Sequence, residues 1–99
     1  MLIYCAHRYG GNEKNKRSAE KIIKLLQTND PDNTYISPIH TFGYVYNDLS
    51  YDRGMELCLS LLSKCNVLLV IGDESKGVKL EIDYAKRNGI PMLFMKGVV

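Results

Sequence analysis

The most constraining feature of the sequence is the uninterrupted apolar run Val67-Leu68-Leu69-Val70-Ile71. A strand that is apolar at every position is typically buried on both of its faces. Such burial is characteristic of a parallel sheet, because the crossovers between parallel strands place helices over both faces. The run therefore predicts an α/β domain built on a parallel sheet.

Three further segments have the length and composition of strands, namely 2–6, 34–36 and 91–95. The spacing of apolar residues predicts helices over about 12–27, 50–64 and 76–88. Residues 37–49 are expected to form a long loop, whose aromatic residues either pack on the core or line a site. The chain is expected to be one domain (1–99), a small doubly wound parallel sheet of flavodoxin or Rossmann type with about four strands and three helices.

The composition limits the kinds of partner. A formal net charge of +2 is too small to indicate a nucleic acid polymer. The cysteines Cys5, Cys58 and Cys65 have no CxxC spacing and no histidine at ligand-like spacing, so buried reduced thiols are expected, with no metal and no cofactor. Without a signal peptide or an apolar stretch of about eighteen residues, the protein is expected to be cytoplasmic and to have no membrane partner.

The predicted helix over 50–64 is apolar around most of its circumference, from Met55 to Leu62. A helix with one buried face needs an apolar stripe of only about 100°. The surplus favours a second buried face, and we therefore expect a homodimer or a larger homo-oligomer.

Ligands of open α/β sheets bind beyond the carboxyl ends of the strands, where loops 7–12, 37–40 and 72–77 are expected. In the third loop, Ser75 offers a hydroxyl and Gly77 allows a close turn into the helix. The unpaired N–H groups of the first helical turn can bind an anion such as a phosphate.

Glu81 lies one helical turn after Gly77. The apolar residues Val78, Ile82 and Ala85 define the buried direction, and Glu81 lies roughly 70° from it at about 100° per residue. The carboxylate is expected to border the core, facing neither fully inward nor fully outward, and the helix N-terminus is expected to favour its ionised form. This suits a nucleophile or an electrostatic stabiliser, although acids are also common early in helices for the dipole alone.

The first loop contains Gly10-Gly11, where the backbone can approach a ligand closely. The polar groups beside it are His7, Arg8 and Tyr9. A third glycine is missing from the dinucleotide fingerprint, so a nucleotide-cradling loop and a plain strand-to-helix turn remain the two interpretations.

Further polar candidates follow the second predicted strand. His40 is expected either to line the same cleft or to be incidental. Asp48, Asp52 and Glu56 are spaced by four residues and can form one acidic edge. If that edge faces the cleft, one carboxylate can hydrogen-bond a sugar hydroxyl or act as a general base. The alternative is that these acids only stabilise the helix start through its dipole.

The stretch from Asp73 to Ala85, DESKGVKLEIDYA, resembles the S-x-G-x-x-x-E-x-x-x-A signature of the nucleoside 2-deoxyribosyltransferase-like superfamily. This group includes 2′-deoxynucleoside 5′-monophosphate N-glycosidases and many short phage and bacterial members. The N-terminal YCAHRYGG, from Tyr4 to Gly11, resembles the opening strand and phosphate-side loop of the same family. With Pro38-Ile39-His40 and the run from Leu62 to Ile71, the resemblance covers nearly the whole chain.

The resemblance implies that Glu81 attacks C1′ of a (deoxy)ribosyl group and displaces the base. A covalent glycosyl-enzyme intermediate forms, which water or a second base then resolves. The resemblance also implies that Ser75, the Gly77 backbone and the loop from Ala6 to Gly11 hold the 5′-hydroxyl or phosphate, and that a neighbouring subunit helps to close the site.

The chain departs from the family pattern at the aspartate that helps to protonate the leaving base, because Cys58 occupies that position. Asp52 and Glu56 on nearby turns are the alternative acids. The sequence therefore predicts cleavage or transfer of the N-glycosidic bond of a nucleoside or nucleotide, with a non-catalytic nucleotide-binding module as the alternative. A phosphoribohydrolase is less favoured, because its usual PGGxGTxxE pattern is absent.

Overall fold

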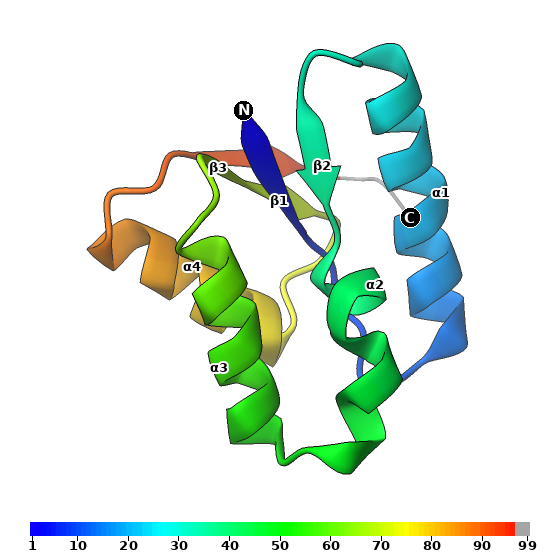
Figure 1. Ribbon diagram of the computed structural model, residues 1–99, viewed down its shortest axis with the longest axis vertical. Helices are drawn as coiled ribbons and strands as arrows, with labels where there is room; N and C mark the ends of the chain where they lie inside the picture. The colour runs from blue at the N-terminus through cyan, green and yellow to red at the C-terminus, as the bar shows by residue number, and fades with distance from the viewer. Residues whose placement is uncertain (97–99) are drawn as a thin grey trace.

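Four parallel strands form a sheet in the order β2-β1-β3-β4 (Figure 1). They are β1 (Leu2–Ala6), β2 (Thr34–Ile36), β3 (Val67–Ile71) and β4 (Met92–Met95). The computed structural model describes residues 1–96. Every residue of β3 is buried, which confirms the prediction of a strand covered on both faces. The connections lead from β1 outward to β2 and then across to β3, so the switch point of this doubly wound sheet lies between β1 and β3.

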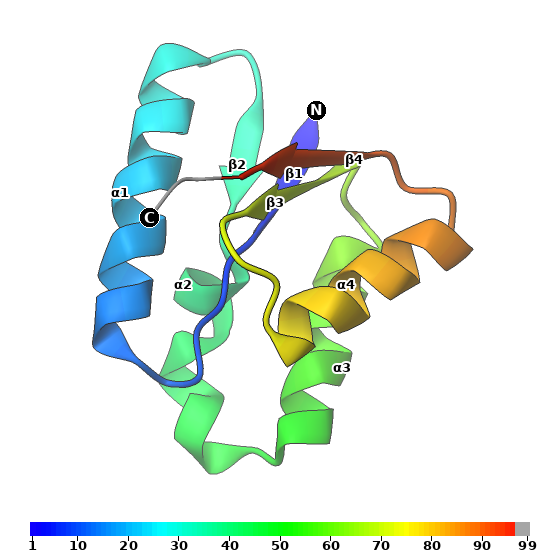
Figure 2. The same ribbon diagram turned by 180° about the vertical axis from the view of Figure 1, so that it is seen from behind.

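The helices cover the two faces unequally (Figure 2). On one face lies α1 (Glu13–Asn29), and its residues Ala19, Ile22 and Ile23 pack against β1 and β3. On the other face lie α3 (Tyr51–Leu62) and α4 (Lys76–Arg87), which bury the opposite sides of the same strands. This two-layer covering places the carboxyl ends of β1 and β3 under the starts of the helices, where a ligand can bind.

The helix ends follow local side-chain chemistry. The Asn12 side chain accepts hydrogen bonds from the backbone N–H groups of Lys14 and Asn15 and so begins α1. Ser75 Oγ accepts from the N–H of Val78 and begins α4. Beyond α4 the chain turns at Gly89, whose φ of 66° suits a residue without a Cβ.

The segment expected to be a long loop is instead helical. It contains α2 (Pro38–Phe42) and the 3-10 helix η1 (Gly43–Asp48), so residues 1–96 contain four α-helices where three were predicted. The Ser37 side chain accepts from the N–H of His40, and Pro38 occupies the first turn, where its missing N–H costs nothing. Together α2 and η1 stand at the carboxyl end of the sheet (Figure 1), where η1 packs against α2 and α2 packs against α3.

Packing within a single chain accounts for only part of the apolar circumference of α3. Leu62 is fully buried, whereas Met55, Leu57, Leu59 and Leu61 are half-buried. The homo-oligomer remains a prediction. No helix within residues 1–96 combines the length and apolarity needed to cross a membrane.

Candidate functional site

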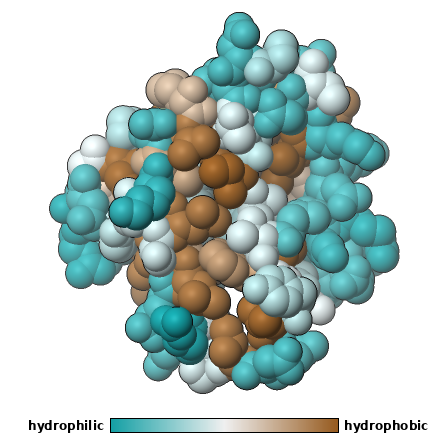
Figure 3. Space-filling model, in the orientation of Figure 1, coloured by the Kyte–Doolittle hydropathy of each residue, from teal (hydrophilic) through white to brown (hydrophobic). Residues whose placement is uncertain are grey.

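A cavity of about 530 Å³ opens at the carboxyl ends of β1 and β3. Its walls come from the loop after β1, from α2 and η1, from the start of α3, and from the start of α4. Figure 3 shows apolar residues bordering a hollow on the face where α3 approaches α2 and η1. The cavity is large enough for a small organic ligand, since such sites commonly occupy about 300–1,000 Å³.

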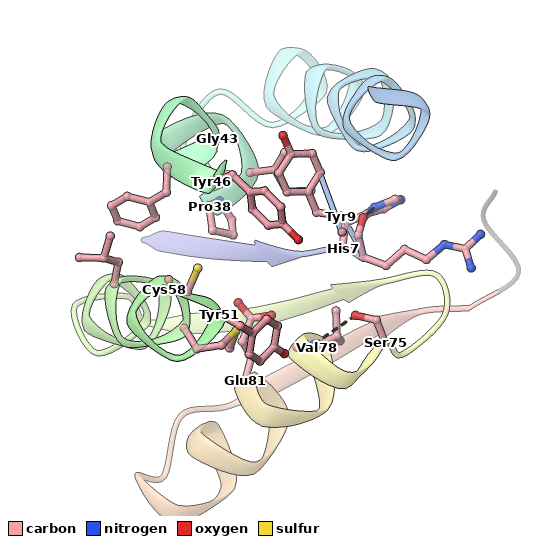
Figure 4. A pocket seen from close by; sticks show the side chains of 18 of the residues that line it. His7, Tyr9, Pro38, Gly43, Tyr46, Tyr51, Cys58, Ser75, Val78 and Glu81 are labelled. Atoms are coloured by element: carbon pink, nitrogen blue, oxygen red, sulfur yellow. Dashed lines mark hydrogen bonds between the residues drawn. The ribbon is translucent and has the colours of Figure 1, made fainter. Parts of the chain in front are cut away.

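The chemistry of the cavity changes from one end to the other (Figure 4). One end has the polar groups of His7 and Ser75, and the other has apolar groups from α2, η1 and α3. Arg8, which also lines the cavity, follows His7 in the same loop. Tyr51 and Glu81 lie between the two ends. A ligand with one anionic end and one flat apolar end would therefore fit in a single orientation.

Glu81 lies at the base of this cavity and is the one buried charged residue within residues 1–96, with 5% of its surface exposed. It was expected to border the core. On α4 it instead belongs to the buried stripe with Val78, Ile82 and Ala85, which repeats at the i, i+3, i+4, i+7 spacing of an inward-facing helix side. The expectation failed because α4 packs against α3 as well as β3, so its buried arc extends beyond the direction defined by its apolar residues.

Tyr4 of β1 is fully buried, and its hydroxyl donates a hydrogen bond to Glu81 Oε2. Burial raises the pKa of Glu81 to about 7, while the hydrogen bond from Tyr4 acts in the opposite direction. The helix N-terminus had been expected to favour the ionised form. Desolvation outweighs that effect, so the carboxyl titrates close to neutral pH.

The two groups nearest to this carboxyl stay protonated. Burial, followed by the charge of Glu81, raises the pKa of Tyr4 well above its ordinary value. Burial and the same charge raise the pKa of the Cys58 thiol to about 11. Tyr4 is therefore a hydrogen-bond donor at any ordinary pH, and Cys58 is a neutral thiol rather than a nucleophile.

Among the residues that the structure describes, Glu81 has no cationic partner. The ion pairs within residues 1–96 involve other carboxylates, all of them at the surface. A buried carboxyl without a compensating charge is costly for the fold, and such groups are concentrated at functional sites. In the same part of the chain, no cluster of three or more histidine, cysteine, aspartate or glutamate side chains could hold a metal ion.

Residues 1–95 match a family described as a domain of unknown function, DUF7768. The chain belongs to this family. No curated protein matches the chain.

Most of the site residues expected from the sequence of the DUF7768 domain meet at the cavity. Those that line it are His7, Arg8, Tyr9, Gly10, Ser75, Gly77 and Glu81. Four of their side chains already have polar partners in the domain. Glu81 accepts a hydrogen bond from Tyr4, and His7 Nδ1 lies 2.7 Å from the carbonyl oxygen of Arg8. Arg8 lies 3.8 Å from Asp73 in an exposed pair, and Ser75 caps α4.

Six expected residues do not line the cavity of the DUF7768 domain, and one of them is the exposed Asp48 at the end of η1. His40 points to Glu20, with Nε2 3.0 Å from Oε1, because α2 turns this side chain towards α1. Asp52 and Glu56 lie on the exposed side of α3, one helical turn apart. Ala6 is buried in the core, and Gly11 lies behind the ring of Tyr46.

The sequence interpretation of the DUF7768 domain missed Tyr4, and it left open whether the aromatic residues around 37–49 pack on the core or line a site. Tyr4 contacts Glu81, and Tyr46 and Tyr51 line the cavity. Tyr4 had a usable signal, because a hydroxyl within a buried strand needs a hydrogen-bond partner. Tyr46 and Tyr51 lay in or next to the segment expected to be a loop, so their direction could not be predicted.

The raised pKa of Glu81 predicts how the stability of the DUF7768 domain depends on pH. The folded form holds the proton up to about pH 7, whereas the unfolded chain releases it near 4.5. The free energy of unfolding should therefore fall by about 3 kcal/mol as the pH rises through this interval. In Glu81→Gln this contribution should be absent. Urea unfolding of both proteins at pH 4.5 to 8 measures the difference. If the free energy of unfolding changes equally with pH in wild type and Glu81→Gln, Glu81 is not a buried ionisable group.

Proposed function

We propose that this protein cleaves the N-glycosidic bond of a nucleoside 5′-monophosphate or nucleoside, with Glu81 as the nucleophile. The observation that carries the proposal is the buried, unpaired carboxyl of Glu81 at the base of an aromatic-lined cavity. A structural role would favour a paired or exposed carboxylate, whereas a nucleophile needs an oxygen directed at the substrate. The Ser-Gly-Glu resemblance in α4 supports the same assignment.

The orientation of the substrate follows from the two ends of the cavity. The phosphate or 5′-hydroxyl would lie near Arg8, Lys76 and the first turn of α4, where cationic side chains and backbone N–H groups favour an anion. The base would lie at the apolar end, near Phe42 and Tyr46. C1′ of the sugar would then lie between them, close to Glu81.

The reaction has two displacement steps. A Glu81 carboxylate oxygen forms a bond to C1′, and the bond from C1′ to the base nitrogen breaks with its electron pair leaving on the base. The departing base takes up a proton from water, and a glycosyl ester remains on Glu81. A second water then attacks C1′ and releases a proton to solvent, the ester bond breaks, and Glu81 is regenerated as a carboxylate. The hydrogen bond from Tyr4 orients the carboxylate for the first attack.

The direct test is a base-release assay on the wild-type protein. A panel of nucleosides, deoxynucleosides and their 5′-monophosphates is incubated with the protein, and free base is measured by chromatography. Released base supports the proposal. Nucleotide binding without release would favour the binding-module alternative, and no binding of any panel member would contradict both.

One observation favours that alternative. Glu81 is the only carboxylate among the described residues that line the cavity, so no second carboxyl group is positioned to protonate a leaving base. Cys58, whose thiol has a pKa of about 11, is a weak acid in that place.

We therefore expect Cys58→Asp to raise the rate of base release, by about 10- to 100-fold if protonation of the base limits the reaction. Cys58→Asn is the matched control, since it has the same shape without the acid and should give no increase. The two rates are compared at pH 6 to 7. Equal rates in both variants would show that this position does not supply the limiting proton.

A further inference from the structure

The wall of the cavity opposite Glu81 is held by an interlock between two segments that are far apart in the sequence. Tyr46 extends from η1 to the loop after β1, where a Cβ on Gly11 would lie 2.8 Å from its Cε1. Tyr9 extends in the reverse direction, and its hydroxyl lies 3.6 Å from the position of a Cβ on Gly43. Each segment thus presents a tyrosine to a glycine of the other.

The two rings also contact each other. Their centroids are 4.9 Å apart and their planes are inclined at 69°, an edge-to-face arrangement that fixes one ring against the other. Figure 4 shows Tyr9 and Tyr46 on one side of the cavity, with Tyr51, Cys58 and Glu81 on the other. A flat ring that entered between the two sides would meet the side chain of Tyr46.

This wall contributes little to the core. No residue of η1 is buried, and Tyr46 remains 40% exposed although its position is closely determined. Gly11 has a φ of 72°, and a Cβ at this position would overlap the ring of Tyr46, so the missing Cβ leaves room for that ring. An aromatic ring that is fixed yet partly exposed in a cavity wall is suited to stacking with a ligand.

We infer that Tyr46 stacks against the base of the substrate and thereby determines how tightly the base is bound, and that Gly11 is the position that holds Tyr46 in place. This inference rests on the proposed function and deepens it. Every base has an aromatic face that can stack on a tyrosine ring. Tyr46 should therefore raise the affinity for all bases without selecting one base over another.

The test compares Tyr46→Leu with Tyr46→Phe. Loss of the ring in Tyr46→Leu should raise KM for base release by about 10- to 100-fold and change kcat far less. The Phe variant keeps the ring and should stay within about twofold of wild type. Calorimetric binding of a deoxynucleoside 5′-monophosphate to the same substitutions in Glu81→Gln provides a readout that does not require turnover.

The role of Gly11 is tested with a matched glycine in the same loop. Gly10 has a φ of 61° and open space around the position of a Cβ, whereas a Cβ on Gly11 would overlap Tyr46. Both alanine variants carry a similar backbone strain, but only Gly11→Ala should raise KM to the level of Tyr46→Leu. If Gly11 acts through Tyr46, the double variant Gly11→Ala/Tyr46→Leu should have the KM of Tyr46→Leu alone.

The outcomes separate this inference from the proposed function. If wild type releases base and Tyr46→Leu keeps its KM and its binding constant, the inference is wrong and the function stands. If wild type binds the nucleotide without releasing base, the binding constants still decide the role of Tyr46. If wild type binds none of the nucleotides, both proposals are wrong.

Discussion

Glu81→Gln should lower the rate of base release by about a thousandfold or more, while the affinity for the nucleotide changes little. Glutamine has the same shape and can still accept the hydrogen bond from Tyr4, but its amide is a poor nucleophile towards C1′. Replacing the buried carboxyl should also leave the protein folded, because Glu81 has no ion-pair partner to lose within the described chain. Rates from chromatography and binding constants from calorimetry measure the two effects separately.

The control for this prediction is Asp83→Asn on the same helix. Asp83 is exposed and pairs with Arg87 at the surface, so the Asp83→Asn variant should release base at the wild-type rate. Intact-mass measurement during turnover should detect a sugar adduct on wild type and none on Glu81→Gln. A Glu81→Gln variant that released base at the wild-type rate would rule out Glu81 as the nucleophile.

Tyr4→Phe should lower base release at pH 7 by about 10- to 100-fold, since a hydrogen bond to a charged group contributes about 1.5–3 kcal/mol. The bond from Tyr4 lowers the pKa of Glu81, and its loss should move that pKa further upward. Attack requires the ionised carboxylate, so activity rises with pH through this pKa. The rising limb of the pH profile should therefore move to higher pH in the variant.

The shift of the pH profile distinguishes this role from a loss of folding. Tyr84→Phe removes a hydroxyl from a half-buried tyrosine of α4 that does not line the cavity, and its pH profile should match that of wild type. If Tyr4→Phe has a lower maximal rate but the same pKa on the rising limb of its pH profile, Tyr4 does not control the ionisation of Glu81.

Local patterns were sufficient to predict the strands and the capped helices. The continuous apolar run of β3 predicted burial on both faces, and Asn12, Ser75 and Gly89 are local signals whose effect does not depend on distant residues. The segment at 37–49 was predicted to be a loop on the basis of its aromatic residues. It also contains Ser37-Pro38, a local helix start that begins α2.

The site was predictable only in part. The Ser75-Gly77-Glu81 spacing located one wall of the cavity, because all three residues belong to one helix start. His40, Asp52 and Glu56 were expected near the cavity on spacing alone, and the directions of α2 and α3 turn them away from it. Spacing along a chain gives the position of a residue on its own element but not the direction in which that element faces.

The amino-acid pattern alone was enough to predict the parallel sheet, the loops at its carboxyl edge, and Glu81 as a candidate site residue. The burial of Glu81, its hydrogen bond with Tyr4 and its pKa near 7 depend on the packing of the folded chain. Desolvation depends on every element packed around the carboxyl, and no local pattern contains that information. Tyr4 and Glu81 are at opposite ends of the chain and meet only when α4 packs on β1 and β3.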